Sequence, residues 1–157
     1  MLLGNKIVAE GLRELAQRIA DNIARNGQTA SGKTARSLEV VDEGSYVTLY
    51  GRRAFRTIET GTPPLGDKIS LNSFAGILYR WSQDKGIVFA DENERWSFAY
   101  AVAKKIKASG SNLFRRGGRD DVYSNEIPKA VEDIRTRLTN ALKLYVEESL
   151  PINTNEQ

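Results

Sequence analysis

Eight consecutive residues, Gly27 to Thr34, read GQTASGKT and match the phosphate-binding pattern G-x-x-x-x-G-K-[ST] at every position. In nucleotide hydrolases this loop follows a strand and opens a helix, so that backbone N–H groups and the helix dipole face the phosphates. Lys33 would then reach the terminal phosphates, and the hydroxyl of Thr34 would bind Mg²⁺. The pattern predicts a nucleotide site only where a strand precedes it and a helix follows it.

The flanking segments predict the opposite order. Before the loop, apolar residues recur at helical spacing, which indicates a helix over 5–26 with Asn5 as its N-cap and Gly27 as its stop. After the loop, two β-rich runs around a turn predict a hairpin over 37–50. Because helix, loop and strand is the reverse of what phosphate binding needs, a nucleotide-binding protein that uses this loop is the alternative hypothesis.

The composition limits the other chemistries. The 157 residues include no histidine and no cysteine, which excludes Ser-His-Asp triads, Cys-His pairs, disulfides and the usual zinc sites. A metal-dependent nuclease would need converging carboxylates, for which Glu39, Asp42 and Glu59 are available with Lys33 nearby. Glu39 and Asp42 are an odd number of residues apart and would point to opposite faces of a strand. We therefore expect no enzyme activity, no metal and no cofactor.

Glu59 has the most unusual position of the single residues. It lies in the stretch RTIETGTPP, directly before a tight turn. A surface carboxylate is one interpretation. The sharper hypothesis is a carboxylate held in place by N–H groups of the turn or by an arginine of a partner.

Basic residues gather in three places although the net charge is only +3. The three clusters are Arg52, Arg53 and Arg56 before the proline turn, Lys104, Lys105 and Lys107 on a predicted helix, and Arg115, Arg116 and Arg119 in a glycine-rich loop. Such clusters can contact DNA phosphates, so a DNA-binding protein is a second alternative. Asp120 and Asp121 follow the last cluster at once. A loop with both signs suits docking between subunits, whereas its paired glycines also suit an anion-binding nest.

The rest of the chain predicts one domain over 1–157, in which no apolar run approaches the length of a membrane span. The segments expected after the hairpin are a strand across Ala54 to Glu59, a two-proline turn over 61–68, helices over 70–84 and 94–109, and a final helix over about 126–150. Asp91 and Glu94 resemble a capping box. The expected class is α+β, with an antiparallel sheet of three or four strands packed by long N- and C-terminal helices, and with an inserted helical pair.

Each later helix has an apolar stripe that is expected to face the core. The stripes are Leu71, Phe74, Ile77, Leu78 and Trp81 in the first helix of the pair, Trp96, Ala99, Val102, Ala103 and Ile106 in the second, and Val131, Ile134, Leu138, Ala141, Leu142 and Tyr145 in the final helix.

Two stretches together resemble a known family. The chain reads TASGKTARSL over 29–38 and AFRTIETGT over 54–62, and the pair is similar to motifs of the minor tail and tail-completion proteins of tailed bacteriophages. In that family an N-terminal helix leads through a T-G-x-L-x-x-S-like segment into a hairpin, and a later strand ends in an aromatic-containing motif that closes with E-x-G-T. The matching residues are Ser31, Gly32 and Ser37 in the first motif, and Phe55, Glu59, Gly61 and Thr62 in the second.

The resemblance implies a structural protein of the phage neck or tail, in the virion and assembled in the host cytoplasm. Such proteins form homomeric rings between the portal complex and the tail tube, and they have no catalytic residues. The expected partners are further copies of the chain, adjacent neck, portal or tail proteins, and packaged DNA through non-specific contacts. On this interpretation the phosphate-loop match is a coincidence built on the first motif.

Overall fold

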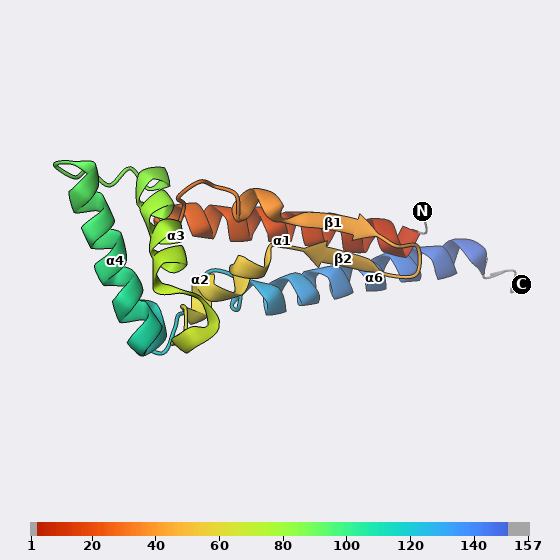
Figure 1. Cartoon of the computed structure of the whole chain (residues 1–157). Coiled ribbons are helices and arrows are strands. Elements are labelled where there is room, and N and C mark those ends of the chain that lie inside the picture. Colours follow the sequence, from red (N-terminus) through yellow and green to blue (C-terminus); the bar gives the residue numbers. More distant parts are fainter. Residues whose placement is uncertain (1–2, 151–157) are drawn as a thin grey trace, which may run out of the picture.

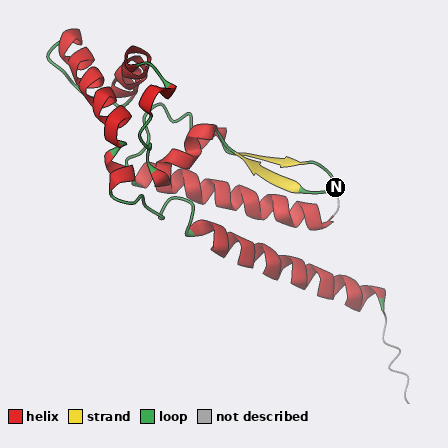
Figure 2. Ribbon diagram, turned by 60° about the horizontal axis from the view of Figure 1, so that its bottom comes forward, coloured by secondary structure: helices red, strands yellow, loops and turns green. Residues whose placement is uncertain are grey.

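The computed structural model describes residues 3–150. Two long helices run antiparallel, a short β-hairpin lies along the first of them, and a helical pair projects from one end of this body (Figure 1). The elements are α1 (Leu3–Arg25), β1 (Glu39–Asp42), β2 (Val47–Tyr50), α2 (Thr57–Thr60), α3 (Leu71–Asp84), α4 (Glu92–Ser109), α5 (Asn112–Arg115) and α6 (Glu126–Ser149). The ribbon coloured by secondary structure shows how little of the fold is strand (Figure 2).

The expected sheet of three or four strands is wrong. Of the described residues 66% are helical, so helices rather than a sheet make up most of the fold. Within the described residues the only sheet is the antiparallel pair β1–β2, in which Glu39 faces Tyr50 and Asp42 faces Val47. The hairpin expected over 37–50, the long first and last helices and the inserted helical pair are present.

The segment expected as a third strand, Ala54 to Glu59, is instead a 3-10 turn (Arg53–Arg56) followed by α2. This segment is helical because of the spacing of the side chains that it turns toward the core. A strand would place Phe55 and Glu59 on one face and Ile58 on the other, whereas a helical turn gathers positions i, i+3 and i+4 together. Phe55 and Ile58 both pack on the core, and Glu59 is buried.

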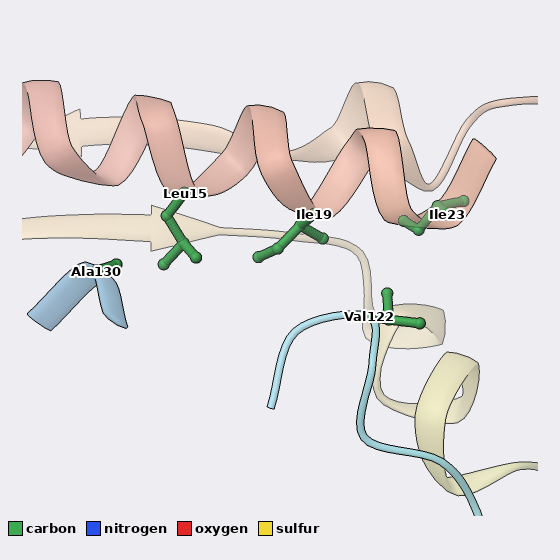
Figure 3. Packing of buried hydrophobic residues seen from close by; sticks show 5 residues of the cluster. All are labelled: Leu15, Ile19, Ile23, Val122 and Ala130. Atoms are coloured by element: carbon green, nitrogen blue, oxygen red, sulfur yellow. The ribbon is translucent and has the colours of Figure 1, made fainter. Parts of the chain in front are cut away.

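The core lies where α1 meets the start of α6 and the segment before it (Figure 3). Its buried members are Leu15, Ile19, Ile23, Val122 and Ala130. Further along, Gly11 lets the helices approach closely, since a Cβ there would stand 2.3 Å from Cγ1 of Ile134. Arg137 adds a two-pronged ion pair to Glu14, with Nη1–Oε1 at 2.9 Å and Nη2–Oε2 at 2.7 Å.

The start of α1 also differs from expectation. Asn5 is not the N-cap, because the helix already includes Leu3. Its side-chain amide instead donates to Oδ1 of Asp42 and to the carbonyl of Gly44, each at 2.9 Å, and so ties the hairpin turn to α1. The expected stop at Gly27 is confirmed by its φ of 64° and by the hydrogen bond from the N–H of Gln28 to the carbonyl of Ile23.

The stripe expected to be buried along α6 is only partly so. Ile134, Leu138 and Ala141 are half-buried, while Val131, Leu142 and Tyr145 are exposed. The reason is geometric: α1 covers one side of the stripe, and its described start at Gly4 lies beside Leu138, so within residues 3–150 the last turns of α6 are exposed. The apolar face of α6 is therefore wider and longer than the surface that covers it.

The α3–α4 pair packs through small residues. Ala75, Ala99 and Ala103 are fully buried between the helices, while Ile77, Trp81 and Trp96 of the expected stripes are exposed. The Asp91 cap is confirmed, since its Oδ1 accepts the N–H of Glu94 at 2.8 Å; Glu94 in turn accepts from Ala90. Lys85 Nζ donates to the carbonyls of Gly27 and Thr29, which joins the pair to the loop after α1.

Alanine at Gly11 is expected to destabilise the fold, because the added Cβ would push Ile134 and α6 away. Gly76 is a matched control: it is also inside a helix, but a Cβ there meets nothing within 4 Å. Gly76→Ala should raise the free energy of unfolding by about 0.5–1 kcal/mol through helix propensity. Gly11→Ala should lower the free energy of unfolding by about 1–2 kcal/mol, although it has the same gain in helix propensity. Urea denaturation followed by circular dichroism measures both, and equal stabilisation would contradict the close packing.

Candidate functional site

Glu59 is the centre of a buried polar arrangement that joins two distant segments of the chain. The single turn α2 presents it inward, and its residue exposure is only 2%. Its Oε1 accepts the backbone N–H groups of Val122 (2.8 Å), Tyr123 (2.5 Å) and Ser124 (3.0 Å). Its Oε2 accepts the hydroxyl of Ser124. We call the carboxylate and these donors the Glu59 clamp.

The clamp keeps the carboxylate ionised. Burial raises the pKa of Glu59, but the Ser124 hydroxyl and the three N–H groups lower it by more, so the pKa lies below the ordinary glutamate value. Three successive N–H groups that converge on one anion form a nest. The clamp thus joins α2 to the segment just before α6 across more than sixty residues of sequence.

The sequence predicted, as one alternative, that backbone N–H groups hold the carboxylate of Glu59, but it predicted the wrong N–H groups. The carboxylate is held by N–H groups, but they belong to 122–124 rather than to the turn that follows Glu59. The glycines of the RRGGRDD stretch indicated an anion-binding nest there as one of two alternatives. The structure has a nest just after that stretch, at 122–124, and its anion is the carboxylate of Glu59. Spacing along the sequence gave no signal for a contact between such distant segments.

The two residues that close the motif, Gly61 and Thr62, hold α5. The N–H of Thr62 donates to Ser111 Oγ at 3.0 Å, and the N–H of Ser111 donates to the carbonyl of Thr62 at 2.8 Å. Gly61 has a φ of 71°, and a Cβ there would stand 2.3 Å from the backbone nitrogen of Phe114. Only glycine leaves room for the backbone of Phe114 at this position. The E-x-G-T stretch therefore holds the segment around α5 against the end of α2. Phe55 stacks on Tyr123 with ring centroids 4.9 Å apart.

The charged residues at the end of α5 and in the loop after it fall into two groups: one pair bonded to each other, and several that form no ion pair within the described residues. Arg119 and Asp121 pair with each other, with Nη2–Oδ2 at 2.6 Å, and the N–H of Arg119 donates to the carbonyl of Glu59. Arg115, Arg116 and Asp120 are exposed, and within residues 3–150 none of the three forms an ion pair. We call these exposed charges, of which Arg115 is the last residue of α5, the arginine loop.

The elements around the phosphate-loop match follow in the order predicted from the sequence: helix, loop, strand. The loop follows the helix α1 and leads through a short 3-10 turn (Ala35–Ser37) into β1. The guanidinium of Arg36 bonds to the carbonyl of Ser31 at 2.7 Å and lies beside Gly32. Ser37 accepts the N–H of Arg52 at 3.0 Å and donates to Thr34. Ser31, Gly32 and Ser37 therefore organise a helix-to-hairpin connection.

Addition of ATP or GTP with Mg²⁺ is expected to give no binding heat, because the loop is followed by a three-residue 3-10 turn and a strand rather than by an α-helix. Lys33 is exposed, so Lys33→Ala should leave the melting temperature within about a degree or two, as a typical surface change does. Isothermal titration calorimetry tests this, with Lys68→Ala as the control for loss of an exposed lysine. Magnesium-dependent binding that disappears only in Lys33→Ala would contradict the expectation.

The remaining candidate groups do not converge. Among residues 3–150 no set of three acidic side chains could hold a metal ion, and Asp42 is engaged by Asn5 and Gly44. Of the lysines on α4, Lys107 bonds to the carbonyls of Gly66 and Ile69, which holds the proline turn. No described helix is long and apolar enough to cross a membrane.

The chain matches no protein-family model, no curated protein and no solved structure.

Proposed function

We propose that the protein is a structural component of a tailed-bacteriophage virion, which forms a homomeric ring in the neck or head–tail connector region. The motifs that suggested this family are the ones that organise the fold: Ser31, Gly32 and Ser37 shape the entry to the hairpin, and Glu59 and Gly61 join α2 to the segments before α6. Neighbouring neck, portal or tail proteins are its partners, and contact with DNA is secondary.

The observation that carries the proposal is the distribution of apolar side chains. Five of the nine buried hydrophobic residues in the described chain are alanines. Among residues 3–150, sixteen large hydrophobic residues are exposed, seven of them in 127–150. Large apolar side chains left exposed in a group, as in 142–150, mark interaction sites. A subunit that completes its core against neighbours has this distribution.

The accessible surface supports the same proposal. It amounts to 10934 Å², whereas a compact monomer of 17.5 kDa exposes about 7,900 Å². Even if the nine residues outside the described range were fully extended, they would account for only about 1,400 Å² of the difference. The remaining excess of about 1,600 Å² is comparable in size with two faces of about 800 Å² each. Two faces per subunit are what a ring requires.

The test is the composition of purified phage particles. Quantitative mass spectrometry should find the protein there in several copies per particle, and cryo-electron microscopy should place it in a ring at the neck or tail. A single copy per particle, or absence from particles, contradicts the proposal. The isolated chain can remain monomeric without contradiction if its ring forms only on the preceding ring.

Reversal of Arg115 and Arg116 to glutamate is expected to block the joining of heads to tails. Both side chains are exposed and lie outside the Arg119–Asp121 pair, so the melting temperature should barely change. Counts of free heads and tails by electron microscopy measure the effect, and the same reversal at Arg135 is the control. Particles that join normally but lose their DNA would show that the arginine loop contacts DNA instead of a protein.

A further inference from the structure

The last turns of α6 extend beyond the rest of the molecule. The described part of α1 begins at Leu3, and Leu138 is the α6 residue beside Gly4, so residues 142–150 continue past that start. Both views show the end of α6 projecting past the N-terminal end of α1 (Figures 1 and 2). Leu142, Tyr145 and Leu150 are 63%, 63% and 66% exposed. We call residues 142–150 the overhang.

A groove of about 540 Å³ lies at the other end of α6, between α1 and the hairpin. Its apolar walls are formed by Leu12, Leu15, Leu49, Phe55, Tyr123 and Ile127. Arg52, Arg53 and Arg56 border it, all exposed, and none of them forms an ion pair within the described residues. Packing of the core leaves this apolar groove open.

We propose that the overhang of one copy docks in this groove of the next copy. The two surfaces are complementary in polarity, because the overhang offers exposed Leu142 and Tyr145 to apolar walls. They are complementary in charge, because the last turn of the overhang carries Glu147 and Glu148, exposed and unpaired among the described residues, and the groove is bordered by three arginines.

The symmetry of the contact follows from the positions of the two surfaces. They lie at opposite ends of α6, so the contact joins different faces of successive copies and repeats head to tail. Such a contact closes into a ring when the rotation per subunit allows it. This inference rests on the proposed homomeric ring and names the surfaces that build it.

Because the native sequence contains no cysteine, disulfide trapping tests the contact directly. Ser149 lies in the overhang and Tyr50 borders the groove, and both are exposed. A chain with Ser149→Cys and Tyr50→Cys should give a ladder of linked oligomers on mild oxidation. A chain with Ser97→Cys and Tyr50→Cys is the matched control, since Ser97 is an exposed serine on α4. It should give no ladder.

Two outcomes overturn the docking. One is efficient linkage of Ser149→Cys to itself, which indicates a symmetric contact between two overhangs. The other is linkage no greater than in the control, both in concentrated protein and in particles. If either occurs while particles still contain several copies, the ring proposal stands and only the docking surfaces are wrong. If particles lack the protein, the ring proposal fails independently of the linkage result.

Charge exchange provides a second test. Glu147→Arg with Glu148→Arg should weaken self-association about tenfold or more, measured by sedimentation equilibrium, or by the number of copies per particle if the isolated chain is monomeric. Arg53→Glu with Arg56→Glu should do the same. All four changes in one chain should restore association, because the charges are again complementary. Failure of the combined variant to recover, when both pairs weaken association, would contradict the docking.

Discussion

Glu59→Ala is expected to be the most damaging single substitution in this chain, with a loss of about 3–5 kcal/mol in the free energy of unfolding. The change removes the acceptor of three backbone N–H groups and one hydroxyl at a site that is almost inaccessible to water. Donors left unpaired after burial cost far more than an exposed hydrogen bond is worth. The start of α6 should lose its anchor, and urea denaturation would measure the result.

Two further variants separate charge from shape. Glu59→Gln keeps an oxygen for the N–H groups but removes the charge, so we expect a smaller loss of about 1–2 kcal/mol. Glu39→Gln removes an exposed carboxylate on β1 and should stay within about 0.5 kcal/mol of wild type. Equal, small effects at Glu59 and Glu39 would contradict the clamp.

The pH dependence of stability gives an independent check on the clamp. Because the folded-state pKa of Glu59 is lowered, its ionised form stabilises the fold above the unfolded-state pKa of about 4.3. That contribution is lost as the pH falls through the folded-state pKa. The difference in unfolding free energy between wild type and Glu59→Gln should therefore be constant near neutral pH and shrink as the solution becomes acidic.

Gly61→Ala is the second change with a large expected effect, a loss of about 2–5 kcal/mol. Alanine at a φ of 71° is strained, and its Cβ would stand 2.3 Å from the nitrogen and 2.8 Å from the Cα of Phe114. Those atoms are backbone and cannot turn aside as a side chain can. The bonds between Thr62 and Ser111 should break as α5 moves away.

Gly44 separates the two causes at Gly61. It has a φ of 83°, yet a Cβ there meets nothing within 4 Å. Gly44→Ala should therefore show the backbone strain alone, about 1–2 kcal/mol. Thermal unfolding of both variants makes the comparison. If Gly61→Ala costs no more than Gly44→Ala, the close approach of the E-x-G-T segment to α5 is not part of the solution structure.

The sequence by itself determined the elements whose signals are local. Helical spacing and the glycine stop predicted α1 to within two residues at its N-terminal end and one at its C-terminal end, and Asp91 marked the start of α4. The order helix, loop and hairpin around Gly27 to Thr34 was also correct. Caps, stops and periodicity act between residues a few positions apart, so they can be recognised without the rest of the chain.

Only the tertiary structure decided the features that depend on distant neighbours. Phe55 and Ile58 form part of a helical turn because both can then pack on α1 and the segment before α6. Glu59 is a clamp because the N–H groups of 122–124 converge on it. Leu142 and Tyr145 share a stripe with Ile134, yet they are exposed in the described chain because they lie beyond Leu138, which is beside Gly4 in the first turn of α1. Periodicity identifies which face of a helix is apolar, but the length and position of its neighbour decide how much of that face is buried.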